Sequence, residues 1–250
     1  MKRSMKPHLH NGRPEAGTRQ WYQVRSEAGE TAEIMIYDEI GVGWFGGGVS
    51  AENFVADVKD MNLGAADTLR LRINSPGGDL FDGNTIYNYL RSQPFAVSVH
   101  IDGLAASAAS IIAMAGNTVN MPENSFLMIH NPWMMVAGDA KVMRKVADDL
   151  DVLREGAVST YMTRVEDKLS RDEVIAMLDE ETWLGAADAV SYGFADVVDE
   201  PVKAAALLRF DLVDYGMEHL PAGITAAQQR AEREKADRRK NLTLLKNSWN

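Results

Sequence analysis

Strand-like and helix-like segments alternate along residues 32–130, and this alternation constrains the fold more than any other feature of the sequence. Residues 68–74 alternate apolar and polar side chains as a half-buried strand does, and 51–61 show helical spacing after a possible Ser50 cap. Alternating strands and helices pack as βαβ units around a mainly parallel sheet, so we predict an α/β fold. Further strands are expected at 32–37, 96–101, 118–121 and 126–130, and further helices at about 83–91 and from Ser107.

Residues 139–169 interrupt this alternation. Apolar side chains recur there at helical spacing with charges between them, at Val142, Val146, Leu150, Leu153, Tyr161, Val165 and Leu169. The pattern predicts one long amphipathic helix, longer than a globular body needs, of a kind that often projects and pairs with a neighbouring subunit. A capped helix from Ser170 to Leu178, a helix at 186–192 and an edge strand at 194–198 are expected to follow.

Composition excludes several classes of function. The 250 residues include no cysteine, which rules out disulfides, thiol catalysis and thiolate metal sites. Residues 1–20 and 230–250 each carry a charge of +4, so the part between them carries −18 within a net charge of −10. An acidic body argues against nucleic-acid binding. The basic start has no apolar run behind it, and the apolar stretch 104–116 is too short to span a bilayer, so we expect a cytoplasmic protein with no membrane contact.

The domain organisation follows from the same patterns. Residues 1–19 are polar and without periodicity, which predicts a disordered basic tail. Residues 20–200 are expected to form the folded domain. Residues 201–250 are expected to form an extension that ends in a charged, partly helical segment.

Two short segments carry the candidate catalytic residues. Ser107 follows a strand and Gly103 and opens an Ala-rich helix, and His130 ends a strand just before Asn-Pro. Such a serine and histidine can form a nucleophile and its general base, and a helix N-terminus offers N–H groups to a developing oxyanion. The pair predicts a serine hydrolase, although each segment alone also suits a structural role. Ser110, one turn deeper, is the weaker nucleophile candidate, and His100 is a distant alternative base.

Other candidates have less support from the sequence. His8 and His10 lie in the tail, and His219 lies in the irregular C-terminal region. Residues 41–46 spell G-x-G-x-x-G, but two more glycines follow before any helix, and the next strand ends on Asn74 where a dinucleotide site has an acid. We therefore expect a surface loop there.

Backbone amides and a carboxylate would complete a serine hydrolase site. Gly77 and Gly78 follow a strand and a proline, where bare N–H groups can bind an oxyanion, and an ordinary Pro-Gly turn is the alternative. The segment 179–181, Asp-Glu-Glu, offers carboxylates to orient the histidine, and a solvated acidic turn is the alternative.

Taken in order, four motifs resemble those of the ClpP family of serine peptidases. They are Ile73-Asn-Ser-Pro-Gly-Gly78, Gly103-Leu-Ala-Ala-Ser107, Met128-Ile-His-Asn-Pro132, and Trp183–Gly193 together with Asp196. The resemblance covers about residues 34–198. It implies the ClpP/crotonase-type fold of stacked βαβ units, with 139–169 as a projecting handle helix that interdigitates between two seven-membered rings.

By position, the resemblance implies that Ser107 is the nucleophile and His130 the general base. It implies that the oxyanion hole is formed by the amide of Ala108 and that of Gly77 or Gly78. The usual glutamine before Ala-Ala-Ser is here Leu104, and the usual Met-Gly after the serine is Ala108-Ala109. The family's triad aspartate is replaced by Glu181, which is one methylene longer, and Asp179 is the alternative acid.

The terminal extensions and the Glu-Thr-Trp-Leu version of the acidic motif are more similar to ClpP-related head maturation proteases of tailed phages and prophages. Those enzymes cleave scaffold and capsid proteins in the prohead. We therefore predict a serine endopeptidase that needs no metal or organic cofactor and forms a heptameric ring or double ring in the host cytoplasm or prohead. The alternatives are a ClpP-type proteolytic subunit working with an AAA+ unfoldase and a non-catalytic ring or scaffold component. An acyl-CoA enzyme of crotonase type shares the implied fold but needs no Ser-His pair.

Overall fold

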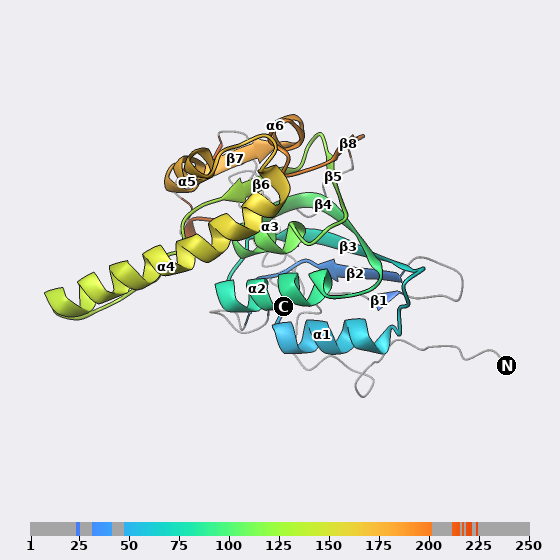
Figure 1. Ribbon diagram of the computed structural model, residues 1–250, viewed down its shortest axis with the longest axis horizontal. Helices are drawn as coiled ribbons and strands as arrows, with labels where there is room; N and C mark the ends of the chain where they lie inside the picture. The colour runs from blue at the N-terminus through green and yellow to red at the C-terminus, as the bar shows by residue number, and fades with distance from the viewer. Residues whose placement is uncertain are drawn as a thin grey trace, which may run out of the picture.

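A computed structural model describes residues 24–25, 32–41, 48–201, 212–215, 217, 219–221 and 224. These residues form a sheet with helices packed on one of its faces (Figure 1). The strands are β1 (Val24–Arg25), β2 (Ala32–Ile36), β3 (Thr68–Ser75), β4 (Ala96–Ala106), β5 (Thr118–Pro122), β6 (Phe126–Ile129), β7 (Thr182–Gly185) and β8 (Val197–Asp199). The helices are α1 (Ala51–Asp60), α2 (Leu80–Arg91), α3 (Ala108–Ala113), α4 (Ala140–Val165), α5 (Arg171–Asp179), α6 (Ala186–Tyr192) and a 3-10 helix at Leu212–Tyr215.

The sheet is mainly parallel, as the alternation of strands and helices predicts. Its strand order is β1-β2-β3-β4-β5-β8, with β6 paired to β4 and β7 paired to β6. The β1–β2 and β6–β7 pairs are antiparallel, and the other pairs are parallel. Strand β4 forks, because its residues 98–100 pair with β5 and its residues 104–106 pair with β6. The fork brings the carboxyl ends of β4 and β6 to one edge of the sheet.

Burial on one face of the sheet explains why these segments form. Leu69, Leu71 and Ile73 alternate along β3 and are fully buried against the helices. Helix α2 begins three residues before the predicted start because the Asp79 side chain accepts a hydrogen bond from the Asp82 N–H at 2.9 Å. Gly83 lets α2 approach α3 closely, since a Cβ there would lie 3.0 Å from the Ala108 Cβ.

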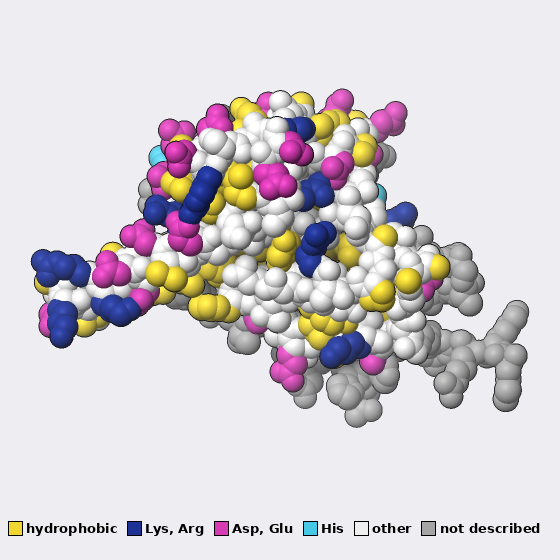
Figure 2. Space-filling model, viewed as in Figure 1, with side chains coloured by type: hydrophobic (Ala, Val, Ile, Leu, Met, Phe, Trp, Pro, Cys, Tyr) yellow, Lys and Arg dark blue, Asp and Glu magenta, His cyan; other side chains and the backbone are white. Residues whose placement is uncertain are grey.

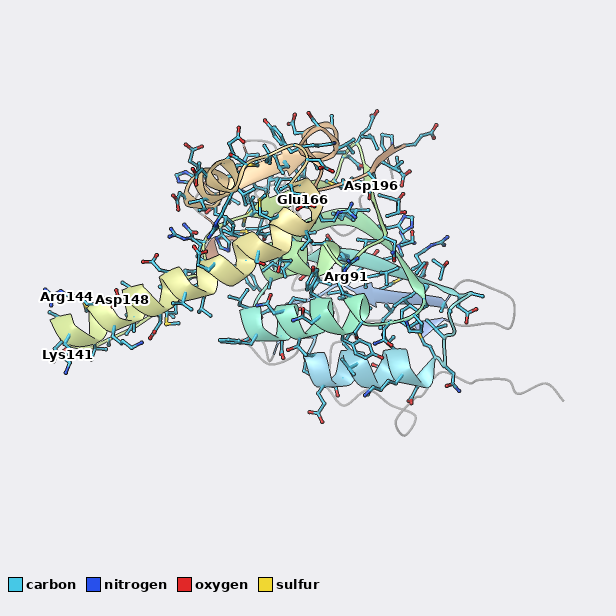
Figure 3. All side chains as sticks on the ribbon, viewed as in Figure 1. Arg91, Lys141, Arg144, Asp148, Glu166 and Asp196 are labelled. Carbon is cyan, nitrogen blue, oxygen red and sulfur yellow. The ribbon has the colours of Figure 1, made fainter. Side chains whose placement is uncertain are left out.

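Helix α4 differs along its length. Its buried residues start at Ala157, and the first half leaves the domain and is exposed, as Figure 1 shows. Figure 3 shows Lys141, Arg144 and Asp148 at the far end of this projection, and basic side chains surround its tip in Figure 2. The prediction of a long projecting helix is confirmed. It ends at Val165, four residues early, where the chain turns before Ser170 caps α5 through a capping box.

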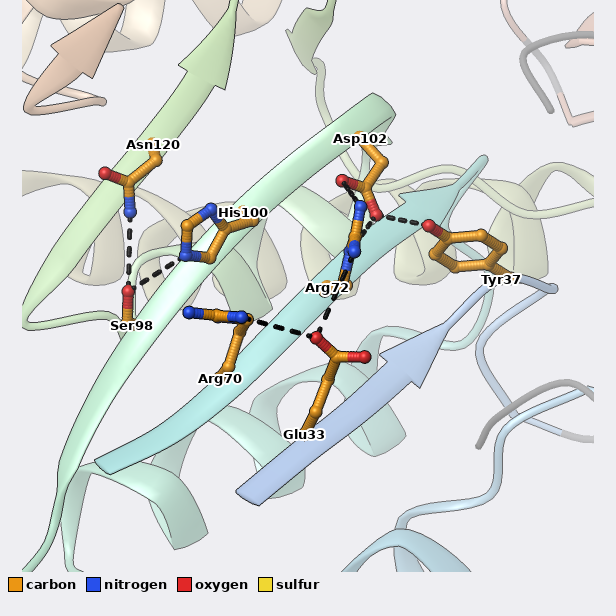
Figure 4. Close-up of polar contacts among 8 residues, drawn as sticks. All are labelled: Glu33, Tyr37, Arg70, Arg72, Ser98, His100, Asp102 and Asn120. Atoms are coloured by element: carbon orange, nitrogen blue, oxygen red, sulfur yellow. Dashed lines mark hydrogen bonds and ion pairs between the residues drawn. The ribbon is translucent and has the colours of Figure 1, made fainter. Parts of the chain in front are cut away.

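The face of the sheet opposite α1 and α2 has two parts. Along β3 and β4 it carries a polar network in which Arg72 Nη2 donates to Asp102 Oδ1 at 2.6 Å and the Tyr37 hydroxyl also donates to Asp102 (Figure 4). Beyond Asp102 the same face of β4 becomes apolar at Leu104 and Ala106. Residues of the C-terminal region pack on this apolar part. One half of the face is therefore stabilised by polar contacts and the other by apolar packing.

Some expectations fall outside the described residues or differ from the structure. Strand β4 runs to Ala106, five residues beyond the predicted end at 101, and strands β1 and β7 are not anticipated by the sequence pattern. The predicted tail at 1–19, most of the 41–46 loop and most of 201–250 lie outside the described residues. Within the described part of the chain, no helix combines the length and hydropathy needed to cross a membrane.

Candidate active site

Ser107 lies at the sharp turn between β4 and α3. Its backbone has φ 53° and ψ −127°, a conformation that residues with a side chain rarely adopt. The turn is held on both sides, since the Ser107 N–H donates to the Met128 carbonyl at 3.0 Å and the Ser107 carbonyl accepts from the Ser110 N–H at 2.9 Å. This strained turn presents the Ser107 hydroxyl at the head of a helix, where the first N–H groups have no intrahelical partner.

His130 follows β6 and meets this serine. Its Nε2 lies 2.8 Å from Ser107 Oγ. The contact results from the parallel pairing of β4 with β6, in which Ala106 is opposite Met128, so the residues after both strands emerge at the same edge. The structure thus brings together the two residues that the sequence marks as nucleophile and base.

Burial sets the protonation state of His130. Desolvation lowers the pKa of the His130 imidazole below its ordinary value, and the negative charge of Glu181 acts in the opposite direction with a smaller effect. The lowered pKa favours the neutral form of the ring. A neutral imidazole that contacts a hydroxyl can accept its proton, which is the requirement for a general base.

The two candidate acids have different surroundings. Glu181, with a left-handed backbone at φ 50°, places Oε1 3.1 Å from the Trp183 Nε1 donor and 3.0 Å from the His219 backbone N–H. Among the described carboxylates, it is the one whose charge acts on His130. Asp179 is exposed and accepts a hydrogen bond from Asn131 Nδ2 at 2.7 Å, with Arg154 of the handle helix 3.7 Å away. The effect of the Glu181 charge on the His130 ring, together with the engagement of Asp179 by Asn131 and Arg154, favours Glu181 over Asp179 as the candidate acid.

Gly77 and Gly78 have different surroundings. Gly77 lies directly against the serine turn, because a Cβ there would be 2.7 Å from Ser107 Cβ and 3.0 Å from Ala108 N. Its N–H donates to Ser75 Oγ at 3.2 Å and its carbonyl accepts from Ile40. Gly78 is exposed and forms a parallel bridge with Ile40, so its own N–H points away from Ile40. The Gly77 N–H is thus bonded to Ser75, while the Gly78 N–H is left out of the bridge to Ile40, so Gly78 is the stronger candidate for an oxyanion donor and Gly77 allows the close approach.

The weaker candidates occupy structural positions. Ser110 is buried, and its hydroxyl donates to the Ser107 carbonyl at 2.6 Å and lies 2.8 Å from the Tyr161 hydroxyl. His100, the distant alternative base, contacts a different serine, because its Nε2 lies 3.1 Å from Ser98 Oγ in the polar region of Figure 4. His219 contributes its backbone N–H, and His8 and His10 lie outside the described residues.

Trp183 and the His219 amide are the contacts of the site that sequence reasoning misses. The alternation Thr-Trp-Leu at 182–184 is a local signal for β7 and for the tryptophan beside Glu181. The His219 contact has no local signal, since it joins residues 38 apart. Within the described ranges, no three His, Asp or Glu side chains gather closely enough to hold a metal ion.

Acyl transfer by a serine needs a base in contact with the hydroxyl and N–H donors at the developing oxyanion. The base is in contact with the hydroxyl where β4 and β6 end, and the candidate N–H donors, Ala108 and the Gly77-Gly78 turn, adjoin the serine. An α/β fold with a serine and a histidine in contact in this way is typical of the serine hydrolases.

Comparison with known proteins narrows this class. The family model described as Clp protease matches residues 16–201, most of the chain, and the chain belongs to this family of serine peptidases. The ATP-dependent Clp protease proteolytic subunit 1 of Synechococcus sp. (strain CC9902) is 32% identical over 140 residues, which are 54% of this chain and 70% of the relative. The proteolytic subunit 2 of Treponema denticola is 32% identical over 138 residues, 53% of this chain and 66% of the relative.

These comparisons confirm the ClpP-family part of the sequence prediction and the α/β ClpP-type fold. The relatives have the names of Clp proteolytic subunits. The closer likeness to phage head maturation proteases stays a prediction.

Proposed function

We propose that the protein is a serine endopeptidase in which Ser107 attacks the carbonyl carbon of a peptide bond. The observation that carries this proposal is the 2.8 Å contact of Ser107 Oγ with Nε2 of His130, whose neutral form is favoured by burial. As the bond forms, the Ser107 proton passes to His130 and the negative charge moves to the carbonyl oxygen. The amides of Gly78 and Ala108 would bind that oxygen, at the head of α3.

The second half of the reaction uses the same residues. His130 donates its proton to the leaving amine, which breaks the peptide bond and leaves an acyl ester on Ser107. Water then attacks the ester while His130 takes a proton, and the acid product and the free serine are released. Glu181 would stabilise the imidazolium that forms in both steps, because its negative charge already acts on the ring.

The test is the reaction of the full chain with an alkyl fluorophosphonate, followed by intact mass and peptide mapping. We expect a single adduct on Ser107 and none in Ser107→Ala. A folded, assembled wild-type protein that forms no adduct would contradict the proposal and favour the non-catalytic ring or scaffold component.

We further propose that the active form is a homo-oligomeric ring, heptameric or doubled, in the cytoplasm. ClpP-family proteins form oligomeric rings and bind protein substrates. The projecting half of α4 and the segment before it expose large apolar side chains, namely Trp133, Met134, Met135, Val136, Val142, Met143 and Val152. Such side chains are expected to be covered by a neighbouring subunit. Native mass spectrometry would give the subunit number, and a monomer at micromolar concentration would contradict this assembly.

The substrate is either unfolded protein delivered by an unfoldase or a capsid or scaffold protein, and two activity assays distinguish these classes. The names of the relatives favour a proteolytic subunit that receives unfolded protein from an AAA+ unfoldase. The Glu-Thr-Trp-Leu motif and the extensions beyond residues 20–200 favour the second candidate, cleavage of capsid or scaffold protein in a phage prohead. ATP-dependent degradation of a tagged folded protein with an added unfoldase would support the first, and unaided cleavage of a co-expressed capsid protein would support the second.

A further inference from the structure

The C-terminal segment, meaning the described residues between 212 and 224, lies outside the sequence motifs yet packs beside the candidate site. Leu212, Met217 and Ile224 are buried in a second apolar cluster with Leu104, Ala106 and Met128. Phe126, Trp183, Tyr215 and Leu220 pack around it. This cluster is separate from the main core between the sheet and its helices.

The position of this cluster relative to the site follows from strand geometry. Side chains two apart on a strand share a face, so Phe126 and Met128 lie on one face of β6, and His130 directly follows the strand. Ala106 immediately precedes Ser107, and Trp183 is two residues after Glu181. The C-terminal segment therefore covers the residues that adjoin all three members of the proposed triad.

One hydrogen bond links the segment to the triad directly. The His219 N–H donates to Glu181 Oε1 at 3.0 Å, and Trp183 Nε1 donates to the same oxygen at 3.1 Å. The segment is braced internally, since the Met217 N–H donates to the Leu212 carbonyl and the Ile224 N–H donates to the Pro221 carbonyl. The donor at His219 is thus held by buried anchors on both sides.

These contacts answer a difficulty that the longer acid creates. Glutamate has one more rotatable bond than aspartate, so its carboxylate has more positions available and loses more entropy when it is held in one. Two donors on Oε1 restrict that freedom, and because the carboxylate is planar they also restrict the position of the other oxygen. The remaining charged side chains of this turn are Asp179 and Glu180, and Asp179 is engaged by Asn131 and Arg154.

We propose that the C-terminal segment is a positioning element of the active site, in which the backbone amide of His219 orients the Glu181 carboxylate toward His130. This inference rests on the proposed serine peptidase function. It makes a region outside the sequence motifs necessary for full activity, through one main-chain donor and its apolar anchors.

The test removes that donor and keeps a matched control. His219→Pro lacks the backbone N–H, whereas His219→Ala keeps it and loses only the exposed imidazole. The measured quantity is the rate of Ser107 labelling by an alkyl fluorophosphonate between pH 5 and 9. We expect His219→Pro to lower the plateau rate about 10- to 100-fold, as a displaced catalytic group does, and to move the midpoint to lower pH. His219→Ala is expected to label as the wild type does.

The pH midpoint separates positioning from a loss of folded protein. Partial unfolding reduces the labelled fraction but leaves the midpoint unchanged. A misplaced Glu181 raises the pKa of His130 less, so the ring becomes neutral at a lower pH. If His219→Pro does not fold, Trp183→Phe removes the other donor to Oε1 and keeps an aromatic ring in the apolar cluster, and the same direction of shift is expected.

The outcomes distinguish this inference from the proposed function. A wild-type protein without any Ser107 adduct overturns both. A wild type that labels, with His219→Pro or Trp183→Phe at the same rate and midpoint, overturns the positioning role and leaves the peptidase intact. Equal losses in His219→Ala and His219→Pro would assign the effect to the imidazole and overturn the role of the amide.

Discussion

The residues along β4 and just after it supply two serines, each paired with a histidine, and only one pair has the surroundings of a catalytic site. Ser107 Oγ lies 2.8 Å from His130 Nε2, and Ser98 Oγ lies 3.1 Å from His100 Nε2. Burial lowers the pKa of both histidines. By hydrogen bonding and by the direction of these pKa shifts, the two pairs are alike.

The backbone around each pair makes the difference. Ser98 and His100 lie within β4, where both residues pair with β3 on one side and β5 on the other, so the main chain is committed to the sheet. Ser107 lies past the end of the strand at a strained turn, directly against Gly77, the residue before the exposed Gly78. In this protein, the Ser–His contact that forms a candidate active site is the one beyond the end of β4, where nearby backbone N–H groups are not paired with a neighbouring strand.

The largest expected contrast lies between the two serines. Ser107→Ala should abolish fluorophosphonate labelling and peptide hydrolysis, because no other hydroxyl contacts both His130 and the helix head among the described residues. Ser98→Ala should keep the labelling rate within about twofold, since its effect is confined to the loss of two hydrogen bonds away from the Ser107 turn, with His100 and Asn120, of about 1 kcal/mol each. Mass spectrometry of the labelled proteins measures both. Labelling of Ser98 in the Ser107→Ala protein would erase the distinction.

The histidines should differ nearly as much. His130→Ala removes the general base and should lower the labelling rate about 10²- to 10⁴-fold, and His100→Ala should leave it nearly unchanged. A time course of fluorophosphonate labelling at pH 8 gives the two rates. Similar losses in both variants would mean that His130 contributes by packing alone.

The role of the Gly78 backbone N–H as an oxyanion donor can be tested by substitution. Its φ is +139°, and a Cβ there would lie 2.2 Å from the Ile40 carbonyl oxygen, so Gly78→Ala must shift the turn and its amide. Loss of one oxyanion donor costs about 10²- to 10³-fold in turnover. The control is Gly156→Ala in α4, where a Cβ meets nothing within 4 Å, and there no loss of activity is expected. A Gly78→Ala protein with wild-type turnover would remove this amide from the oxyanion hole.

The smallest expected effect concerns pH. The labelling rate should rise as His130 loses its proton, and because burial lowers the pKa of His130 the rise should occur below the ordinary histidine range. Glu181→Gln removes the charge that raises this pKa, so its midpoint should move further toward acid. Asp179→Asn should leave the midpoint in place. Rate-against-pH curves for the three proteins check this, and a shift in Asp179→Asn alone would reverse the assignment of the acid.

Local pattern was sufficient to predict much of the fold. Period-two alternation predicts β3, the Ser50 cap predicts α1, and the capping box at Ser170 predicts α5, because these signals act over a few residues. The pattern does not predict β7 or the extension of β4 to Ala106. Both depend on pairing with β6, a partner distant in the chain.

The sequence by itself determined the alternating α/β architecture, the ordered motifs and the choice of Ser107 and His130 as candidates, since each is encoded by adjacent residues. Tertiary structure alone favours Glu181 over Asp179 as the candidate acid, because the preference depends on which carboxylate acts on the His130 ring and which turns toward Asn131. It also favours Gly78 over Gly77 as the candidate oxyanion donor, through the bridge to Ile40. The docking of the C-terminal segment on Glu181 belongs to the same category, because a hydrogen bond between residues 38 apart exists only once the sheet has placed them together.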